Sequence, residues 1–204
     1  MIKRLVESLR RRSRAGSAPV DDESPPVTVT TGGGDQGQSS LFTGERDFKD
    51  ADVFEALGDI DELNSWLGVI RRKEDLGDLG GMIPDIQSCL GRILSVLATS
   101  PRSSLFEQLD PVGDIEIARL EHEQRSLKGR ISLEPRFITP GEDDGIPELD
   151  VVRAVARRCE RRVVRVIHRS GRPDPEIRQA QIYLNRLSDY LFVLARAVEQ
   201  RDSE

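Results

Sequence analysis

The sequence predicts an all-α fold, a five-helix up-and-down bundle with a glycine-rich N-terminal loop. Five segments repeat apolar residues at steps of three and four, the spacing that gives a helix one buried face. No segment has a convincing sheet pattern, and no repeat recurs at a fixed period. With 204 residues, 37% of them hydrophobic, the chain can bury one core, so we expect a single bundle domain at residues 27–200.

Residues 1–26 are expected to be a disordered basic tail and linker. The first fourteen residues hold six Lys and Arg side chains against Glu7, and residues 15–26, AGSAPVDDESPP, are small, acidic and proline-bearing. A basic amphipathic N-terminus is typical of a mitochondrial presequence, and it is equally typical of a disordered bacterial tail. We therefore expect a cytoplasmic protein, or a mitochondrial-matrix protein if residues 1–26 are a presequence.

A glycine-rich loop follows the short strand-like alternation VTVT at 27–30. The glycines of TGGGDQGQSS satisfy GxGxxG literally, but the following helix and βαβ context of a dinucleotide site are missing. The Walker loop fails because Gln38 stands where its lysine belongs. What remains is a loop rich in amides and hydroxyls, which is either a polyphosphate-binding nest or a plain linker.

Three helices are expected in the first two thirds of the bundle. The first runs from Ala51 to about Arg72 with Asp50 as its cap, and the second spans Ile83–Ala98. The third spans Val112–Lys128, with its inward positions including Ile115, Leu120 and Leu127. Beside the apolar stripe of the first helix lies a row of mostly small residues that includes Asp61. This row is either an approach site for another backbone or an exposed polar row.

The fourth helix is centred on Val151–His168, VVRAVARRCERRVVRVIH. Its apolar valines and Cys159 recur on one face, while seven arginines occupy the rest of the cylinder and Glu160 interrupts them. Guanidinium groups bind phosphate and carboxylate bidentately, so this face is either a site for polyphosphate or an acidic partner, or a solvated helix surface. The arginines are Arg153, Arg157, Arg158, Arg161, Arg162, Arg165 and Arg169.

The fifth helix is expected from Asp174 and Pro175 to about Glu199. Leucines recur along it in three-and-four alternation, as in the seam of an antiparallel bundle. Asn185 and Asp189 lie one turn apart at the edge of that seam. An amide and a carboxylate there either link two helices or form a nucleotide and metal site.

Composition excludes several classes of protein. The net charge is −6, and the part beyond the basic tail is more acidic still, so we expect no nucleic-acid binding. Cys89 and Cys159 lie in apolar stripes without a CxxC pattern, which indicates a reducing compartment. No apolar run approaches the ~18 residues needed to cross a bilayer, so no membrane association is expected. Neither histidine follows a glutamate by three positions, so we expect no carboxylate-bridged metal pair and no protein-held metal site.

Three separated stretches together resemble one family. They are GDQGQSSLFTGER at 34–46, EALGDIDELNSWLG at 55–68, and RAVARRCERRVV with YLNRLSDYLFVLAR at 153–164 and 183–196. This combination resembles the PduO-type ATP:cob(I)alamin adenosyltransferases. The resemblance implies a homotrimer with active sites between subunits, in which ATP, with Mg2+, gives its 5'-deoxyadenosyl group to the cobalt of cobalamin. Adenosylcobalamin and triphosphate are the implied products, with hand-off to an adenosylcobalamin-dependent enzyme as a further possibility.

The resemblance also implies roles for residues. Arg157 is expected to be the main phosphate contact in the transition state and Asn185 a nucleotide contact, so both are predicted to be catalytic. Phe137, in FITPG, resembles the aromatic residue that helps to displace the lower axial ligand of cobalamin. Asp61 and Arg153 match positions that pair across the subunit interface in relatives, so these two residues, with Asp189, are expected to support that interface. The full expected ATP site comprises Thr30, Thr31, Gly34, Ser39, Ser40, Lys49, Arg157, Arg158, Glu160, Arg161 and Asn185.

The chain departs from the family pattern at three places. The loop reads TVTTGGGD where relatives read TxTGD, Pro140, Gly141 and Glu142 replace PGG, and Leu149 to Arg153 read LDVVR in place of LHxAR. The last two departures motivate an alternative, a divergent, non-catalytic protein of the same fold that binds cobalamin or ATP.

Overall fold

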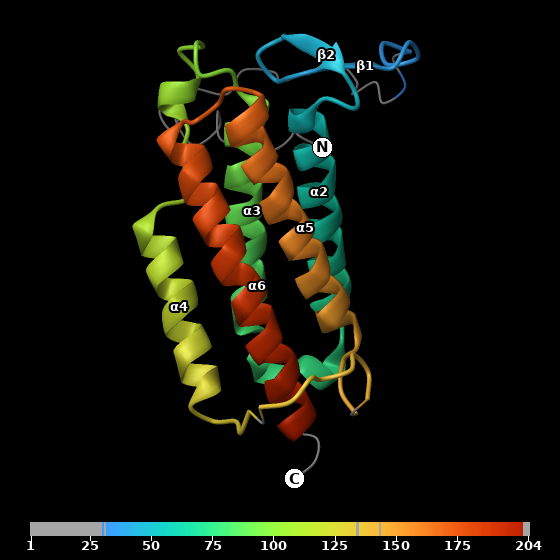
Figure 1. Ribbon diagram of the computed structural model, residues 1–204, viewed down its shortest axis with the longest axis vertical. Helices are drawn as coiled ribbons and strands as arrows, with labels where there is room; N and C mark the ends of the chain where they lie inside the picture. Colours follow the sequence, from blue (N-terminus) through green and yellow to red (C-terminus); the bar gives the residue numbers. More distant parts are fainter. Residues whose placement is uncertain (1–29, 31, 134, 143, 202–204) are drawn as a thin grey trace, which may run out of the picture.

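A computed structural model describes residues 30, 32–133, 135–142 and 144–201 of the chain. Within this part the chain is a bundle of five α-helices with a two-stranded hairpin at one end, which confirms the predicted all-α class (Figure 1). None of its helices is long and apolar enough to cross a membrane. The elements are β1 Gln38–Ser40, β2 Arg46–Phe48, α2 Asp52–Ile70, η1 Glu74–Met82, α3 Ile83–Ala98, η2 Phe106–Gln108, α4 Asp114–Lys128, α5 Glu148–Arg169 and α6 Pro175–Arg201.

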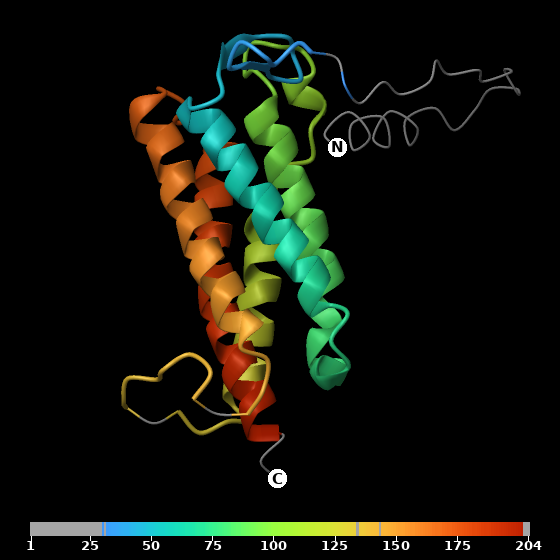
Figure 2. The same ribbon diagram turned by 90° about the vertical axis from the view of Figure 1, so that its right-hand side faces the viewer.

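The bundle is organised around α6 and α5, which pack against each other over most of their length. Helix α4 packs on the other side of α6, while α2 packs on α5 and α3 (Figures 1 and 2). The leucine seam of α6 is fully buried, at Leu184, Leu187, Leu191 and Leu194. The three-and-four periodicity therefore identified the core face of this helix correctly.

Two predictions about helix ends and faces are wrong. Ala51, not Asp50, is the N-cap of α2, and no side chain caps that end. Asp52 and Glu55 lie in the first turn instead, where negative charge favours the helix dipole. Ile115, expected inside, is 82% exposed because the buried face of α4 runs through Ile117, and two residues along a helix differ by roughly 200°.

The glycine-rich segment forms an antiparallel hairpin that the sequence did not indicate. Gln38 pairs with Phe48 and Ser40 with Arg46, so each strand has only three residues, too few to show alternation. The hairpin rests on the end of α3 because Phe42 N donates to Ala98 O at 2.8 Å. Ser100 N donates to Thr43 Oγ1 nearby, at 3.0 Å. The VTVT segment lies outside the described residues except for Thr30.

Arg172, between α5 and α6, caps the same end of α3. Its guanidinium donates to Leu97 O and Thr99 O, both at 3.1 Å, and to Val96 O at 3.4 Å. Asp174 accepts from Arg172 Nε at 3.1 Å and holds the guanidinium in place. The last carbonyl groups of a helix lack hydrogen-bond donors within the helix. Arg172 supplies such donors at the end of α3.

A half-buried ion pair between Arg92 and Glu116 fixes the start of α4. This pair predicts that the protein loses stability in acid. Arg92 Nη1 contacts Glu116 Oε1 at 2.7 Å, and Gly113 N donates to Glu116 Oε2 at 2.9 Å. Burial alone would raise the pKa of Glu116, but these hydrogen bonds outweigh it and lower the pKa below 4.5. A depressed folded-state pKa contributes stability that is present above the unfolded-state pKa and is lost as the pH falls through the folded value.

We expect Glu116→Gln to flatten the acid limb of the stability profile below pH 4.5. The glutamine keeps an acceptor for Gly113 but cannot bind a proton on acidification. Urea unfolding midpoints at neutral pH and at about pH 3 would measure the slope for both proteins. An unchanged slope would show that other carboxylates dominate acid unfolding.

Candidate active site

The arginine-rich face of α5 is divided between two flanks. On the flank that meets α2, three arginines are paired with carboxylates of the same chain. Arg158 contacts Glu62 and, at 3.2 Å, Asp59; Arg162 contacts Glu55 at 2.5 Å and Asp59 at 3.1 Å; Arg165 lies 3.9 Å from Asp52. The hydrogen bond to Asp59 is the main reason that the pKa of Arg162 is raised. Arg158, expected to bind ATP, is thus placed in this ladder of α2–α5 ion pairs.

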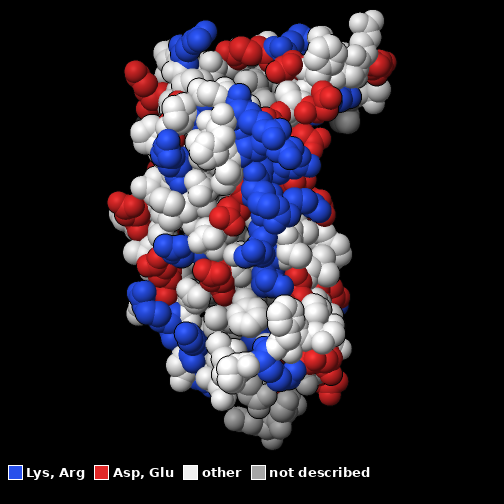
Figure 3. Space-filling view, viewed as in Figure 1, with Lys and Arg blue, Asp and Glu red and all other residues white. Residues whose placement is uncertain are grey.

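The other flank of α5 faces α6 and borders an open pocket of about 250 Å³, here called the α5–α6 pocket. Figure 3 shows Lys and Arg side chains gathered in a band over α5. Arg157 is exposed and has no carboxylate partner in the part of the chain that the structure describes. The pocket is lined by Gln124, Lys128, Leu133, Arg153, Arg157, Ser188, Asp189, Phe192 and Val193. Three expected site residues, Arg153, Arg157 and Asp189, therefore meet here.

Asn185 and Glu160 are brought together next to this pocket. Asn185 Nδ2 donates to Glu160 Oε1 at 3.1 Å, and Asn185 Oδ1 accepts from Arg186 Nη1 at 2.7 Å. Arg186 is held in turn by Glu121 of α4, with Nε 2.7 Å from Oε1. Both ends of the Asn185 amide are therefore oriented by charged neighbours. Such an oriented amide can present a fixed contact to a ligand.

Arg153 and Asp61 have different surroundings in the single chain. Arg153 Nε lies 3.5 Å from Asp150 Oδ1, and its guanidinium carbon lies 5.9 Å from the centre of the Phe192 ring. Within the described residues the Asp61 carboxylate has no ion-pair partner, and its backbone carbonyl accepts from Ser65 Oγ at 2.9 Å. The expected pairing of Asp61 with Arg153 across two subunits remains a prediction.

The expected ATP loop has one close internal contact. A Cβ on Gly34 would lie 2.9 Å from Lys49 Nζ, so glycine lets the lysine lie against the loop backbone. Lys49 N also donates to Gly37 O at 2.8 Å, which closes the loop. Two predicted site residues, Gly34 and Lys49, are thus neighbours.

Arg46, the first residue of β2, is a contact of the glycine-rich loop that the sequence interpretation missed. It donates to Gly33 O at 2.9 Å and to Ser40 Oγ at 3.3 Å, and so holds the glycine segment over the hairpin. The sequence could have indicated Arg46, because it is the last residue of the motif GDQGQSSLFTGER at 34–46. Ser39 lies opposite Asp47 in the hairpin, and Thr30 is exposed. Thr31 lies outside the described residues.

Phe137 lies in the connection between α4 and α5, and its side chain is fully exposed. Figures 1 and 2 place this connection at the end of the bundle opposite the hairpin. Helix α5, which runs between the two ends, is roughly 33 Å long for its 22 residues. The structure therefore does not bring Gly34 and Lys49 together with Phe137 inside one chain. Arg157 lies between these two groups along α5.

The two cysteines are buried and show no sign of a chemical role. Cys159 Sγ donates to Asp59 O at 3.1 Å, and burial is the main cause that raises the pKa of Cys159 to about 12. Burial also raises the pKa of Cys89. Among the described residues no group of three or more His, Cys, Asp and Glu side chains could hold a metal ion.

We expect neither cysteine to react with a disulfide reagent such as DTNB in the native protein near pH 8. The thiolate is the reactive form, and burial raises the pKa of both thiols, that of Cys159 to about 12, so little thiolate is present at that pH. Unfolding in guanidinium should release both thiols. Absorbance of the released chromophore counts them, and rapid native labelling would contradict the burial of these side chains.

The fold and the pocket together define a class, an α-helical bundle with an arginine-lined site suited to a polyanionic ligand. Residues 29–198 match the model of a protein family described as "Cobalamin adenosyltransferase". The chain belongs to this cobalamin adenosyltransferase family.

Relatives and solved structures agree with this membership. The corrinoid adenosyltransferase MMAB of Bos taurus is 40% identical over 196 residues, covering 92% of this chain and 78% of the relative. The corrinoid adenosyltransferase of Bacillus subtilis is 32% identical over 182 residues, covering 82% and 84%.

Two solved structures of a PduO-type adenosyltransferase from Lactobacillus reuteri share the fold. One is a phenylalanine-to-alanine variant complexed with cobalamin and ATP, with a TM-score of 0.76 and 25% identity, covering 86% of this chain and 96% of that one. The other is an arginine-to-lysine variant complexed with ATP, with a TM-score of 0.74 and 27% identity over the same shares.

Proposed function

We propose that this chain transfers the 5'-deoxyadenosyl group of ATP to the cobalt of cob(I)alamin, giving adenosylcobalamin and triphosphate. The observation that carries this function is the match of 86% of the chain, at a TM-score of 0.76, to an adenosyltransferase complexed with both cobalamin and ATP. In the reaction the electron pair of Co(I) forms the cobalt–carbon bond to C5'. The C5'–O bond breaks, and its electron pair leaves with the triphosphate.

Arg157 is proposed to stabilise the charge that develops on the departing triphosphate. Its guanidinium is exposed beside the α5–α6 pocket, and it can form two parallel hydrogen bonds to phosphate oxygens. Arg161 lies one turn further along the same helix and is also exposed. Because little acid–base chemistry is needed in this transfer, positioning and charge stabilisation should supply most of the rate enhancement.

Asn185 is proposed to position the nucleotide rather than to donate a proton. Glu160 and Arg186 hold its amide from both ends, so its orientation does not depend on the ligand. Mg2+ is proposed to enter with ATP, since this ion is commonly held by substrate phosphates and one or two carboxylates. Glu160 accepts a hydrogen bond from the Asn185 amide and could serve as such a ligand.

Phe137 and the loop that carries it are proposed to form the corrinoid side of the site. The half-buried Phe192 and Leu133 line the α5–α6 pocket, and the exposed Phe137 follows Leu133 by four positions along the chain. A planar macrocycle is well matched by such apolar surface. The altered residue Glu142 accepts from Thr139 N at 3.1 Å and pairs with Arg136, so its charge is used within the loop.

The active site is proposed to form between adjacent subunits of a homotrimer. In one chain the Gly34–Lys49 contact and Phe137 lie at opposite ends of the bundle (Figure 1). A neighbouring copy could bring its hairpin to the exposed Arg157 of this chain. The Asp61 carboxylate has no ion-pair partner among the described residues, and in the trimer it would meet a cationic side chain of the neighbouring subunit.

We expect Asp61→Ala to weaken trimer assembly and activity together. Removal of one carboxylate from a subunit contact leaves a neighbouring cation without its partner, and this costs affinity. Sedimentation velocity at several protein concentrations would report the assembly. Asp78→Ala, at an exposed position of η1, is the matched control and should leave the trimer intact. Equal sedimentation of both variants and the original chain would argue against the proposed contact.

The function is tested by incubating the protein with ATP, Mg2+ and chemically reduced cobalamin under anaerobic conditions. The visible spectrum should change to that of adenosylcobalamin, with many turnovers per site. Formation of no adenosylcobalamin would overturn the proposed function. Formation of one equivalent or less per site would favour the non-catalytic alternative, a carrier or sensor of the same fold.

A further inference from the structure

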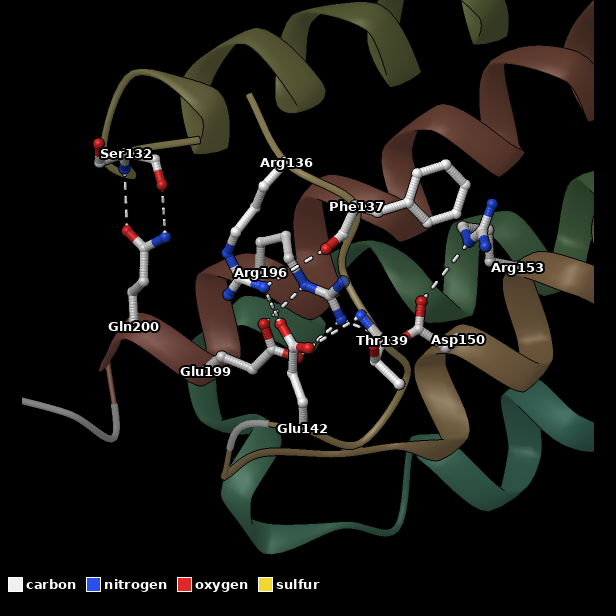
Figure 4. Close-up of polar contacts among 10 residues, drawn as sticks. All are labelled: Ser132, Arg136, Phe137, Thr139, Glu142, Asp150, Arg153, Arg196, Glu199 and Gln200. Carbon is white, nitrogen blue, oxygen red and sulfur yellow. Dashed lines mark hydrogen bonds and ion pairs between the residues drawn. The ribbon is translucent and has the colours of Figure 1, made fainter. Parts of the chain in front are cut away.

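A buried arginine lies beneath the α5–α6 pocket without lining it. Arg196 of α6 is only 4% exposed, and its guanidinium contacts Asp150 at 2.7 Å and Glu199 at 2.6 Å (Figure 4). Removing an arginine and two carboxylates from water is costly, and buried ion pairs are often no more stabilising than apolar residues of similar size. The arrangement therefore calls for an explanation other than stability.

Asp150 connects this buried group to the pocket wall. Its Oδ2 accepts from Arg196 Nη2 at 2.7 Å, while its Oδ1 lies 3.5 Å from Arg153 Nε. Asp150 is itself 6% exposed, so it has little access to solvent or ligand. One carboxylate thus holds two guanidinium groups, of which only that of Arg153 lines the pocket.

Phe192 is held by the same two arginines. The guanidinium carbon of Arg153 lies 5.9 Å from the centre of the Phe192 ring, and that of Arg196 lies 5.4 Å from it. Both distances are within the range of a cation–π interaction. Phe192 lines the pocket with Arg153, so the orientation of both wall residues depends on the buried pair.

The same group also touches the connection that carries Phe137. A Cβ on Gly145 would lie 2.9 Å from Glu199 Cγ, so the chain passes closely over Glu199 just before α5. At the other end of this connection Ser132 N donates to Gln200 Oε1 at 2.9 Å, and Gln200 Nε2 donates to Ser132 O at 2.7 Å (Figure 4). The last turns of α6 therefore fix both ends of the Phe137 connection.

We propose that Asp150 and Arg196 are positioning residues for the corrinoid: they act through Arg153, Phe192 and the Phe137 connection without touching the substrate. This inference rests on the proposed function. The corrinoid, rather than ATP, is the substrate concerned because the buried pair lies at the end of the bundle opposite the hairpin (Figures 1 and 4). Arg153 and Phe192, which the buried pair orients, line the pocket together with Leu133, and Leu133 belongs to the connection that carries Phe137.

The primary test is Asp150→Asn, which keeps the size of the side chain and removes the charge shared by the two arginines. Titration with cob(II)alamin in the presence of ATP, followed by visible absorbance, should give a Kd about tenfold higher. The KM for the corrinoid should rise by a similar factor, while the KM for ATP should change less than twofold. A uniform loss affecting both substrates, or an unchanged corrinoid Kd, would overturn the proposal.

Two further variants distinguish positioning from stability. Arg196→Lys keeps the charge but cannot span Asp150 and Glu199 with a planar fork, so a smaller rise of about threefold in the corrinoid Kd is expected. Arg153→Lys combined with Asp150→Asn should raise the Kd no more than the larger single change, because both disturb one arrangement. Fully additive effects would contradict the shared role of Asp150. If Asp150→Asn were too unstable to study, an unchanged corrinoid Kd in Arg196→Lys would overturn the proposal instead.

Glu116→Gln is the matched control, since it makes the same chemical change in an ion pair between α3 and α4. It should lower stability in a comparable way and leave the corrinoid Kd unchanged. The original chain separates the two proposals. If it binds cob(II)alamin but forms no adenosylcobalamin, the proposed function fails and the Kd comparison still tests the positioning role. If it is active and Asp150→Asn binds normally, only the positioning role fails.

Discussion

Replacement of Arg157 by alanine is expected to lower the rate of adenosylcobalamin formation about 100- to 1000-fold. A prearranged donor to charge that develops in the transition state typically contributes about 3 to 4 kcal/mol. Arg157 is exposed and lines the α5–α6 pocket, so its removal leaves no buried partner unsatisfied. The fold should therefore survive the substitution. Anaerobic turnover with saturating ATP and cob(I)alamin gives the rate, and circular dichroism checks the helices.

The control for this experiment is Arg125→Ala, another exposed arginine of the bundle. Arg125 lies on α4, and its only ion pair with a described residue is a weak 3.8 Å contact with Glu121, one turn earlier. Its loss should change the rate by less than twofold, because solvent-exposed pairs contribute little. If Arg157→Ala retained most of the activity, the leading phosphate contact would have to be assigned elsewhere. Arg161, on the same exposed row, would be the next residue to test.

Replacement of Arg172 by alanine is expected to destabilise the fold by about 3 kcal/mol. The change removes hydrogen bonds to carbonyls at the end of α3, including Leu97 O and Thr99 O. These groups lie in a buried segment, so water cannot easily replace the guanidinium. The hairpin should loosen as well, because Phe42 N is bonded to Ala98 O in that same turn. Guanidinium unfolding at a fixed protein concentration would measure the loss.

Arg178→Ala is the matched control for Arg172→Ala. Arg178 lies six residues further along the chain and is exposed, and its side chain makes one long hydrogen bond to the described residues, 3.4 Å to Pro173 O. Its replacement should change the free energy of unfolding by no more than about 0.5 kcal/mol. Similar losses for the two variants would show that the cap on α3 contributes little.

The helices were predictable because their burial patterns are periodic along the sequence. In α6, for example, Leu184, Leu187 and Leu191 are all fully buried at the expected spacing. The errors fall where the signal is short or ambiguous. The three-residue strands of the hairpin carry no usable alternation, and Ile115 was placed inside because a single apolar residue does not reveal which face it occupies.

The sequence grouped the candidate site residues into motifs, but it did not show their contacts. Arg153, Arg157 and Asp189 share the α5–α6 pocket, and Asn185 bonds to Glu160, as their clustering on two helices suggested. The sequence alone could not show which arginines α2 would neutralise, because this depends on the rotation of α2 against α5. The role of Arg172 was hidden for a similar reason, since its acceptors lie more than seventy positions earlier in the chain.

In the ladder of α2–α5 ion pairs, carboxylates of the chain compete with external anions for the arginines of α5. Asp59, Glu62 and Glu55 are tethered beside Arg158 and Arg162, so their effective concentration there is at least in the millimolar range. A nucleotide that bound on that flank would have to replace these carboxylates. On the opposite side of the helix, the exposed Arg157 has no such competitor among the described residues. If the proposed function holds, the tethered carboxylates favour approach of the triphosphate from the side of Arg157.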